Sequence, residues 1–484
     1  MDAHPDHIFL KLPDGTGFSF GDVIRAGRAL KNKIEPGNSR PVAVQSNHKR
    51  APVIIAACWS AGIPFWMIPP DLNTENLSDS QQKMLESHLG HIKPAAMLGE
   101  SQNDLLKLLP KIDFDLESED SESENPPPSP DSVFCWITTS GTSGDPKILV
   151  LRRSQMIHAA KASALNFRPD PGESWLLSLP LHHIGGISVV LRSWIYGSSV
   201  EVARPDDYAR IKNILKGKES CVIVSLVPTQ ILKLLEDKSF HPHKNFKAIL
   251  TGGGPAAKIL IENARSRNIP VIRSYGMSET CAQITAVKFS EEETVDPECS
   301  GSVLSGNEIQ IRDDENRRVK SGETGLIWLK GPQVISEYVH PAESGFFDEN
   351  GWFCSGDYGR LDTEERLFVE MRREDRIVSG GENVSPEEIE SLLESLNEIS
   401  RAAVIGVENP KWGQAVIAFI EKTESQKPGD SEFWRILIRE KLQLPPFKVP
   451  YRVFVLEKIP QTELGKIKKG ELRKLAADKM RGLR

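Results

Sequence analysis

Short apolar runs of β type alternate with helical patterns along this chain as far as residue 274. The expected strands are residues 41–45, 65–68, 95–98, 133–137, 175–179, 221–225, 246–250 and 270–274. Residues 50–61, 228–236 and 256–266 have the spacing of helices, and Ser19 followed by Asp22 predicts a capped amphipathic helix. Strands that alternate with helices usually form a mainly parallel sheet covered on both faces. We therefore predict an α/β fold with mixed, mainly parallel sheets.

The chain of 484 residues is longer than one hydrophobic core usually holds, so two or more domains are expected. From about residue 300 to 371 the pattern changes to short strands and turns, which predicts a small β-barrel-like subdomain. Residues 376–484 have the pattern of a separate, small α+β unit. The expected organisation is a large N-terminal domain over residues 1–371 followed by this C-terminal domain.

An acidic, proline-rich segment at residues 115–131 explains the net charge of −7, because it holds seven acidic residues and no basic one. Its composition predicts a disordered or extended surface loop. The rest of the chain is balanced in charge, so nothing indicates a nucleic-acid partner.

Six scattered cysteines without a Cys-x-x-Cys pair fit a reducing cytosol and argue against a zinc or disulfide framework. The N-terminus has no basic and apolar leader pattern. The uncharged run from Ala51 to Pro70 contains several prolines, which suits a helix and a buried strand better than a membrane span. A cytoplasmic protein without a membrane span is expected.

A loop rich in hydroxyl side chains follows the expected strand at residues 133–137. It contains Thr139, Ser140, Gly141, Thr142, Ser143, Gly144 and Lys147. Glycines let backbone N–H groups converge on an anion, hydroxyls add donors, and the lysine adds a mobile positive charge. The loop suits a polyphosphate, although it does not have Walker A spacing. A flexible surface loop is the alternative.

Three further segments carry groups that suit a nucleotide. Gly252, Gly253 and Gly254 allow a flat base to approach the backbone, and their spacing alone also matches a dinucleotide fingerprint. In the segment from Ser274 to Thr280, an aromatic ring can stack on a purine and Glu279 can hold Mg²⁺, whereas the plain alternative is a strand that turns into a capped helix. Asp357 follows a tight turn and suits a ribose diol, or an ordinary β-turn.

His182 and His183 precede an expected buried helix that Arg192 interrupts. Adjacent residues of a regular element point to different sides, so the two histidines are poor joint metal ligands, and packed rings in a loop are the alternative. An unpaired buried guanidinium is costly, so Arg192 needs an anionic partner unless its side chain reaches the surface.

These segments occur in the order of the motifs of the adenylate-forming superfamily, the acyl- and aryl-CoA synthetases and their relatives, which the chain resembles from about residue 18 to 475. Two more segments add to the resemblance: residues 371–377, similar to the family's hinge, and residues 460–467, similar to its terminal Gly-Lys motif. The departures are Ile148 for a glycine, His182 for a phenylalanine, Ser278 and Ser355 for threonines, and Met371 for a glycine.

The resemblance implies a role for each segment. Residues 139–144 and Lys147 would bind the phosphates of ATP. Gly252, Gly253 and Gly254 would lie beside adenine and Tyr275 would stack on it, while Ser274, Gly276 and Ser278 would also belong to the ATP/AMP-binding site. Asp357 and Arg372 would bind the ribose, and Glu279 with Thr142 would hold Mg²⁺. His183 would be the gate beside an acyl site that also includes Gly253.

The implied reaction has two steps, in which the substrate carboxylate is first adenylated with release of pyrophosphate and then transferred to coenzyme A. Lys466 would be the catalytic lysine of the first step. The C-terminal domain would then rotate about Glu374, in a hinge over residues 372–375, and Gly380 and Gly381 would guide CoA. The C-terminal domain is therefore expected to be mobile.

Within the superfamily, residues 179–186, 194–197, 252–256 and 274–284 most resemble the 2-succinylbenzoate–CoA ligases of menaquinone biosynthesis. The second carboxylate of such a substrate would be the partner of Arg192. Another aryl- or acyl-CoA ligase would share the motifs and differ in the acyl pocket, and a stand-alone adenylation domain would load a carrier protein. The expected partners are a small carboxylate, ATP and CoA, with the protein a monomer or homodimer.

Overall fold

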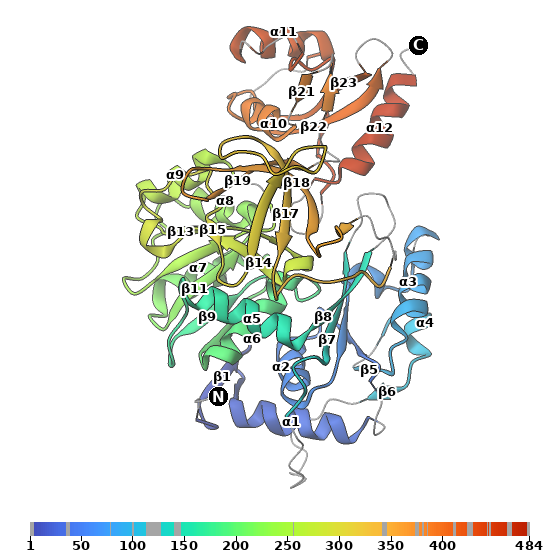
Figure 1. Cartoon of the computed structure of the whole chain (residues 1–484), viewed down its shortest axis with the longest axis vertical. Helices are drawn as coiled ribbons and strands as arrows, with labels where there is room; N and C mark the ends of the chain where they lie inside the picture. The colour runs from blue at the N-terminus through green and yellow to red at the C-terminus, as the bar shows by residue number, and fades with distance from the viewer. Residues whose placement is uncertain are drawn as a thin grey trace. The chain divides into compact units, whose positions relative to one another are not determined.

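The computed structural model describes residues 4–34, 39–77, 79–98, 101–112, 127–139, 147–254, 256–340, 346–372, 377–379, 382–384, 386–409, 413–423, 429–442, 444, 447–461 and 467–481. The chain divides into two compact units (Figure 1). The first unit comprises Met1–Gln310, Trp328–Cys354 and Glu365–Leu367, and the second comprises Ile311–Ile327, Ser355–Glu364 and Phe368–Arg484. Most of the acidic segment at 115–131 lies outside the described residues, as does most of the predicted hinge at 372–375.

The larger sheet of the first unit has nine strands. Their order is β15 (Ser302–Val303), β14 (Ala282–Ala286), β13 (Val271–Met277), β12 (Ala248–Thr251), β11 (Cys221–Leu226), β9 (Ser174–Leu177), β10 (Ser199–Val202), β1 (Ile8–Lys11) and β2 (Gly17–Ser19). The pairs from β13 across to β1 are parallel, and antiparallel strands close both edges. The mainly parallel sheet predicted from the alternating pattern is confirmed.

The second sheet of this unit has six strands. Their order is β6 (Lys111–Ile112), β5 (Ala96–Leu98), β3 (Val42–Gln45), β4 (Phe65–Ile68), β7 (Val133–Thr139) and β8 (Lys147–Arg152). All pairs are parallel except β7 with β8. β4 is buried along its whole length, because its residues are apolar on both faces and both faces are covered.

The packing contacts between the two sheets run through three helices: α2 (Ala51–Ala61), α5 (Arg153–Ala164) and α6 (Ile184–Tyr196). α6 packs on β9, β10 and β14 and also contacts α2, while α5 contacts β8 of one sheet and β14 of the other. The uncharged run that begins at Ala51 is therefore a core helix followed by β4. Within the described ranges, no helix is long and apolar enough to cross a bilayer.

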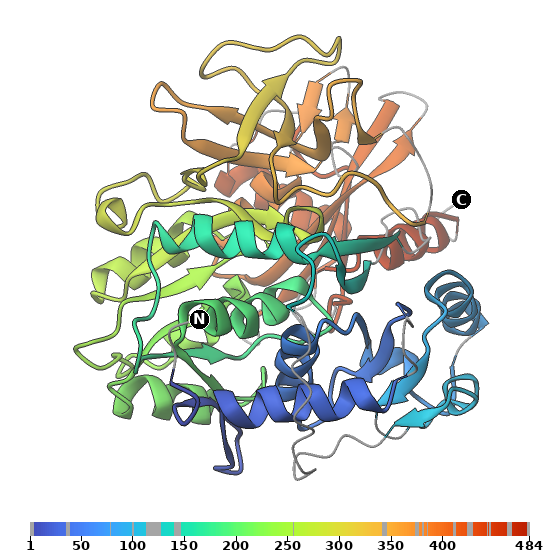
Figure 2. The same cartoon turned by 60° about the horizontal axis from the view of Figure 1, so that its bottom comes forward.

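The other face of the nine-stranded sheet is covered by α7 (Tyr208–Gly217), α8 (Pro228–Glu236) and α9 (Lys258–Ser266). Their apolar side chains share one core with β9, β11, β12 and β13. The capped helix predicted after Ser19 is α1 (Phe20–Asn32), which packs on α2 (Figure 2). The Ser19 hydroxyl accepts from the Asp22 N–H at 3.1 Å and the Asp22 carboxylate accepts from the Ser19 N–H at 2.7 Å, a complete capping box.

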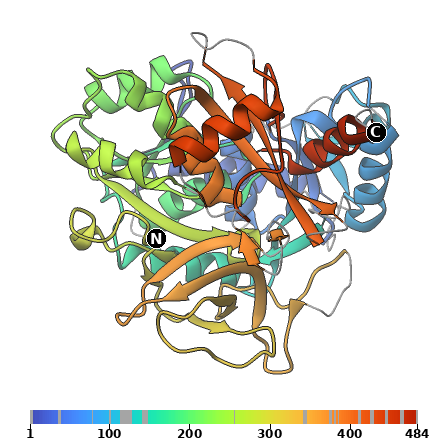
Figure 3. The same cartoon turned by 90° about the horizontal axis from the view of Figure 1, so that it is seen from above.

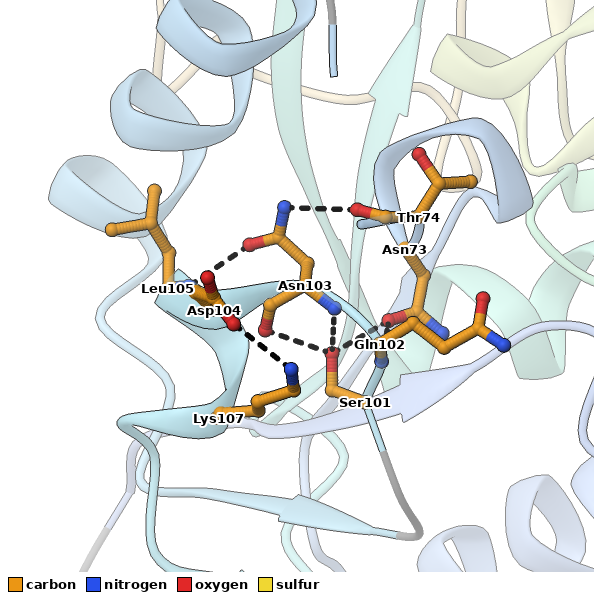
Figure 4. Close-up of polar contacts among 8 residues, drawn as sticks. All are labelled: Asn73, Thr74, Ser101, Gln102, Asn103, Asp104, Leu105 and Lys107. Carbon is orange, nitrogen blue, oxygen red and sulfur yellow. Dashed lines mark hydrogen bonds and ion pairs between the residues drawn. The ribbon is translucent and has the colours of Figure 1, made fainter. Parts of the chain in front are cut away.

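A polar cluster fixes the loop after the short helix η1 (Pro70–Leu72) to α4 (Asp104–Lys107) (Figure 4). The buried Asn73 amide oxygen accepts from the Ser101 hydroxyl at 2.6 Å, and the Asn103 amide donates to the Thr74 carbonyl at 3.2 Å. Asn103 also caps α4 through the Leu105 N–H at 2.9 Å. These bonds satisfy polar groups that burial would otherwise leave unpaired.

The β-rich segment expected from about residue 300 contains a four-stranded sheet. It consists, in order, of β16 (Glu308–Arg312), β17 (Gly325–Lys330), β18 (Phe353–Leu361) and β19 (Leu367–Arg372).

The C-terminal part of the second unit is an α+β layer structure (Figure 3). Its sheet has the order β21 (Glu382–Val384), β20 (Ile377–Ser379), β23 (Gly413–Lys422) and β22 (Ile399–Asn409), with β24 (Arg452–Val455) also paired to β23. One face packs on α10 (Pro386–Glu394) and α11 (Ser431–Leu442), and the other on α12 (Lys469–Arg481).

His88, on α3 (Asp79–Ile92), is a buried titratable group in the core of the six-stranded sheet. It is 1% exposed, its ring meets Trp66 edge-on at 5.8 Å, and neither ring nitrogen has a hydrogen-bond partner among the described residues. Burial, with smaller effects from His340 and His91, lowers its pKa to about 4. Folding therefore holds the imidazole neutral.

Because the folded pKa of His88 lies below the ordinary value, its contribution to stability is present above pH 6.5 and is lost as the pH falls towards 4. We expect the free energy of unfolding of the wild type to fall by about 3 kcal/mol more than that of His88→Phe over this range. Melting temperatures of both proteins across the range provide the measurement, and identical pH profiles would contradict the expectation.

Candidate active site

The carboxyl ends of β9, β11, β12 and β13 meet at one edge of the nine-stranded sheet, because these neighbours are parallel. Hydrogen bonds join the connections that follow them: the Ser178 hydroxyl donates to the Ser225 carbonyl at 3.3 Å, and the Gln230 amide donates to the Ser178 carbonyl at 3.1 Å. In open α/β sheets, ligands bind outside the carboxyl ends of the strands. This edge is therefore the candidate active site.

The glycine segment 252–254 begins where β12 ends. Gly253 has φ +78°, a conformation that other residues rarely adopt, and a Cβ on it would lie 3.5 Å from Val227. The Ser274 hydroxyl donates to the Thr251 carbonyl at 2.8 Å and so fixes the end of β12 to β13. Residues 252–254 therefore have no side chains at this edge, so a flat ligand could lie close to their backbone.

Glu279 lies on a tight 3₁₀ turn, η2 (Ser278–Thr280), directly after β13. The turn is closed by the Thr280 hydroxyl, which accepts from the Met277 N–H at 3.0 Å and donates to the Ala282 carbonyl at 2.7 Å. Cys281 and Ala282 follow with φ of 54° and 83°. Two consecutive non-glycine residues in the left-handed region indicate backbone strain, which clusters at functional sites.

Tyr338 connects Glu279 to the end of the predicted phosphate loop. Its hydroxyl donates to Glu279 Oε1 at 2.6 Å. The ammonium of Lys147, the first residue of β8, lies 5.3 Å from the Tyr338 ring centroid and 4.0 Å from that of Phe346. The structure thus brings Lys147 and Glu279, which sequence analysis assigned to phosphate and Mg²⁺ binding, against one side chain.

A segment on which sequence analysis was silent holds Tyr338 in place. The Ile335 N–H donates to the Glu279 carbonyl at 2.9 Å, and residues 339 and 340 exchange backbone hydrogen bonds with Ile148. Gln333 is fully buried, and its amide donates to the carbonyls of Thr280 at 2.7 Å and Gln283 at 2.8 Å. We call residues 333–340 the strap.

His182 and His183 lie in the turn before α6, where His183 is the N-cap residue. Their ring centroids are 4.2 Å apart. The two rings therefore pack against each other in a loop, which confirms the alternative considered from the sequence, because the turn is not a regular element. Burial lowers the pKa of His182 to about 4. Among the described residues, no three potential ligands of the His, Cys, Asp or Glu type gather as a metal site.

Arg192 is buried within α6, 3% exposed, and its Nη1 donates to the side-chain oxygen of Gln283 at 3.0 Å. Gln283 in turn donates to the Ser163 hydroxyl at 3.2 Å, and Arg192 Nη2 has no partner within the described ranges. The burial of Arg192 shows that the surface-reaching alternative is wrong, and among the described residues no carboxylate forms an ion pair with it. The described residues thus supply a neutral amide to one guanidinium nitrogen and no partner to the other.

Asp357, on β18 of the second unit, is buried, and its N–H donates to the Ser355 hydroxyl at 3.1 Å. The side chains of Thr139 and Arg372, and all of Ser140, Gly141, Thr142, Ser143, Gly144, Glu374, Gly380, Gly381 and Lys466, lie outside the described residues. Their assignments remain predictions.

Comparison with known proteins identifies the family. Residues 3–339 match the AMP-binding enzyme family, and residues 388–466 match the AMP-binding enzyme C-terminal domain. The chain belongs to the AMP-binding enzyme family. It is 30% identical over 480 residues to the 2-succinylbenzoate–CoA ligase of Enterococcus faecalis, covering 95% of each chain.

Two solved structures of the Bacillus subtilis o-succinylbenzoate CoA synthetase, MenE, have 28% sequence identity to this AMP-binding enzyme. One is in complex with the acyl-adenylate intermediate OSB-AMP, with a TM-score of 0.84 and coverage of 97% of this chain and 96% of that chain. The other is in complex with ATP and magnesium ion, with a TM-score of 0.83 and coverage of 97% of both chains.

Sequence analysis of this AMP-binding enzyme missed Gln283, Gln333 and Tyr338. Gln283 lies within residues 274–284, the segment that sequence analysis had identified by its family resemblance, so its position in the sequence could have indicated that it lies near the site. The strap has no local pattern that would mark it as part of a site.

Gly276 tests how closely the backbone is packed beside Glu279. A Cβ on Gly276 would lie 1.8 Å from the Ala282 carbonyl oxygen, whereas one on Gly254 would meet nothing within 4 Å. We expect Gly276→Ala to destabilise the AMP-binding enzyme by about 3 kcal/mol and to lower its melting temperature by several degrees. Gly254→Ala is the matched control and should change stability by less than about 0.5 kcal/mol. Equal melting temperatures for the two variants would contradict the packing.

Proposed function

We propose that this AMP-binding enzyme is a 2-succinylbenzoate–CoA ligase that acts in menaquinone biosynthesis. A substrate carboxylate oxygen attacks the α-phosphorus of ATP, the bond to the β-phosphate breaks, and an acyl adenylate and pyrophosphate form. The thiol of CoA then loses its proton and attacks the acyl carbonyl, and AMP leaves. The named relatives support this assignment.

The observation that carries the proposal is the placement of Lys147 and Glu279 against Tyr338 beside the strand ends. Adenylation develops negative charge on the transferring group, so fixed cations are needed where it develops. Lys147 supplies one from the described part of the chain, and we assign Lys466 as the second. Adenine would lie beside Gly252, Gly253 and Gly254 and stack on Tyr275, Asp357 and Arg372 would bind the ribose, and Ser274, Gly276 and Ser278 would complete the ATP/AMP-binding site.

The residues present fit a magnesium ion. Glu279 is a hard oxygen donor that forms no ion pair with another described residue, and Mg²⁺ is usually bound by one or two carboxylates together with substrate phosphates. Glu279 and Thr142 would hold it. When bound, the ion would neutralise charge on the polyphosphate.

Arg192 supports the choice of substrate. Its Nη2, which has no partner among the described residues, is a buried cationic donor on α6, and the N-cap residue of this helix is His183, the proposed acyl-site gate. A dicarboxylate would bring a second carboxylate to this nitrogen, whereas a simple benzoate or fatty acid would not. Gly253 and His183 would line the same acyl site.

The remaining assignments concern the motion of the C-terminal domain, the location in the cell and the oligomeric state. We propose that the C-terminal domain rotates about Glu374 between the two steps, so that Lys466 leaves and Gly380 and Gly381 guide CoA. None of the six cysteines, all of which lie in the described part of the chain, forms a disulfide, which supports a cytoplasmic enzyme. We propose a monomer or homodimer.

The direct test of the function is pyrophosphate release over a panel of aromatic and aliphatic carboxylates, with and without CoA. We expect release with 2-succinylbenzoate and thioester formation only when CoA is present. A preference for monocarboxylates would contradict the substrate, and acyl transfer to a carrier protein in place of CoA would contradict the second step.

We expect Lys466→Ala to suppress adenylate formation by at least about 100-fold while thioester formation from a pre-made acyl adenylate changes little, because the charge of Lys466 is needed only in the first step. Lys458→Ala, an exposed lysine nearby, is the control and should leave both half-reactions unchanged. Equal losses in both half-reactions of Lys466→Ala would indicate damage to the domain and remove the assignment.

We expect Arg192→Leu to raise the KM for 2-succinylbenzoate by roughly 30- to 150-fold, which corresponds to about 2–3 kcal/mol of charge-assisted hydrogen bonding. The KM for ATP should not change, and it serves as the internal control for folding. An unchanged KM for the dicarboxylate would refute the contact.

A further inference from the structure

Tyr338 contacts two opposite charges with two different parts of its side chain. The hydroxyl donates to the Glu279 carboxylate at 2.6 Å, while the ring lies 5.3 Å from the Lys147 ammonium. The ring of Phe346, 5.1 Å from that of Tyr338, completes the aromatic surface under Lys147. A cation over aromatic faces is attracted by the ring quadrupole, and more strongly when it is desolvated.

An ammonium and a carboxylate that contact the same side chain attract each other, and the attraction grows as the effective dielectric falls. No ion pair joins Lys147 and Glu279 in the described part of the chain. Each charge instead contacts Tyr338: the carboxylate accepts from its hydroxyl, and the ammonium lies over its ring and over the nearer ring of Phe346. Neither has to be released from the other before a ligand can use it.

The position of Tyr338 is itself set by both segments that it joins. On one side the Ile335 N–H donates to the Glu279 carbonyl at 2.9 Å. On the other, the Val339 N–H donates to the Ile148 carbonyl at 2.8 Å and the Ile148 N–H donates to the His340 carbonyl at 2.7 Å. The backbone on either side of Tyr338 is therefore fixed to the residue after Lys147 and to Glu279 itself.

We propose that Tyr338 is a positioning residue that keeps Lys147 and Glu279 apart and oriented, so that the lysine is available to the polyphosphate and the carboxylate to its magnesium ion. This inference rests on the proposed function. The hydroxyl sets the carboxylate, in the way that outer hydrogen bonds orient metal ligands. The ring sets the ammonium and blocks the direct ion pair.

The two parts of the side chain can be separated by substitution. Tyr338→Phe removes the hydroxyl and keeps the ring, whereas Tyr338→Leu removes both. The measurement is equilibrium binding of α,β-methylene-ATP, a non-reactive analogue, by titration calorimetry with Mg²⁺ and with EDTA. This readout does not depend on turnover.

For Tyr338→Phe, we expect metal-free affinity within about twofold of the wild type and an Mg²⁺-dependent gain in affinity reduced about tenfold. For Tyr338→Leu, we expect metal-free affinity to fall as well, because Lys147 can then pair with Glu279. Tyr358→Phe is the matched control. Tyr358 is also a buried tyrosine whose hydroxyl donates to a carboxylate, Asp314 at 2.9 Å, and its Mg²⁺ dependence should match the wild type.

The outcomes are distinct. If Tyr338→Phe keeps the wild-type gain with Mg²⁺, or loses metal-free and metal-dependent affinity equally, the positioning role is overturned while the proposed function stands. If the wild type itself does not bind the analogue, the proposed function fails and this inference with it.

Discussion

The backbone hydrogen bonds of the strap, residues 333–340, are the connection on which the candidate site depends. β8 and β13 belong to different sheets, and the strap is bonded to Ile148 at the start of one and to Glu279 after the other. Each bond contributes about 1 kcal/mol, but leaving a buried partner unpaired costs more. Two functional segments are therefore held in a common frame by main-chain geometry, which varies less than side-chain contacts do.

Strain beside Glu279 is offset by this same strap. Cys281 and Ala282 occupy the left-handed region, at a cost of about 1–3 kcal/mol each. The buried amide of Gln333 bonds the carbonyls of Thr280 and Gln283 on either side of them, and its oxygen accepts from Asn307 at 2.9 Å. The Gln333 side chain is hydrogen-bonded through both its nitrogen and its oxygen, and it holds the Glu279 turn in a conformation that local preference alone would not choose.

Arg192 differs from Gln333, because it is a buried group whose second guanidinium nitrogen has no partner in the described ranges. Burial lowers its pKa from the ordinary value, but a guanidinium remains protonated in proteins. Its Gln283 partner is neutral, so the positive charge is not cancelled within the described chain. A buried positive charge without an anionic partner is costly, and this cost is the physical basis of the proposal that Arg192 binds the second carboxylate of the substrate.

Local patterns in the sequence determined the parallel strands, the helices between them, the Ser19 cap and the placement of Gly253 and Glu279 after strands, because periodicity, capping and turn chemistry act over a few residues. Tertiary structure alone decided that Tyr338 meets Glu279 across 59 residues, that Arg192 meets Gln283 across 91, and that the rings of His182 and His183 contact each other. The sequence of the loop was enough to identify Lys147 as a candidate, but it did not show that the Lys147 ammonium lies over the rings of Tyr338 and Phe346. Contacts between segments far apart in the chain leave no local signature, since they depend on how whole sheets and helices pack against one another.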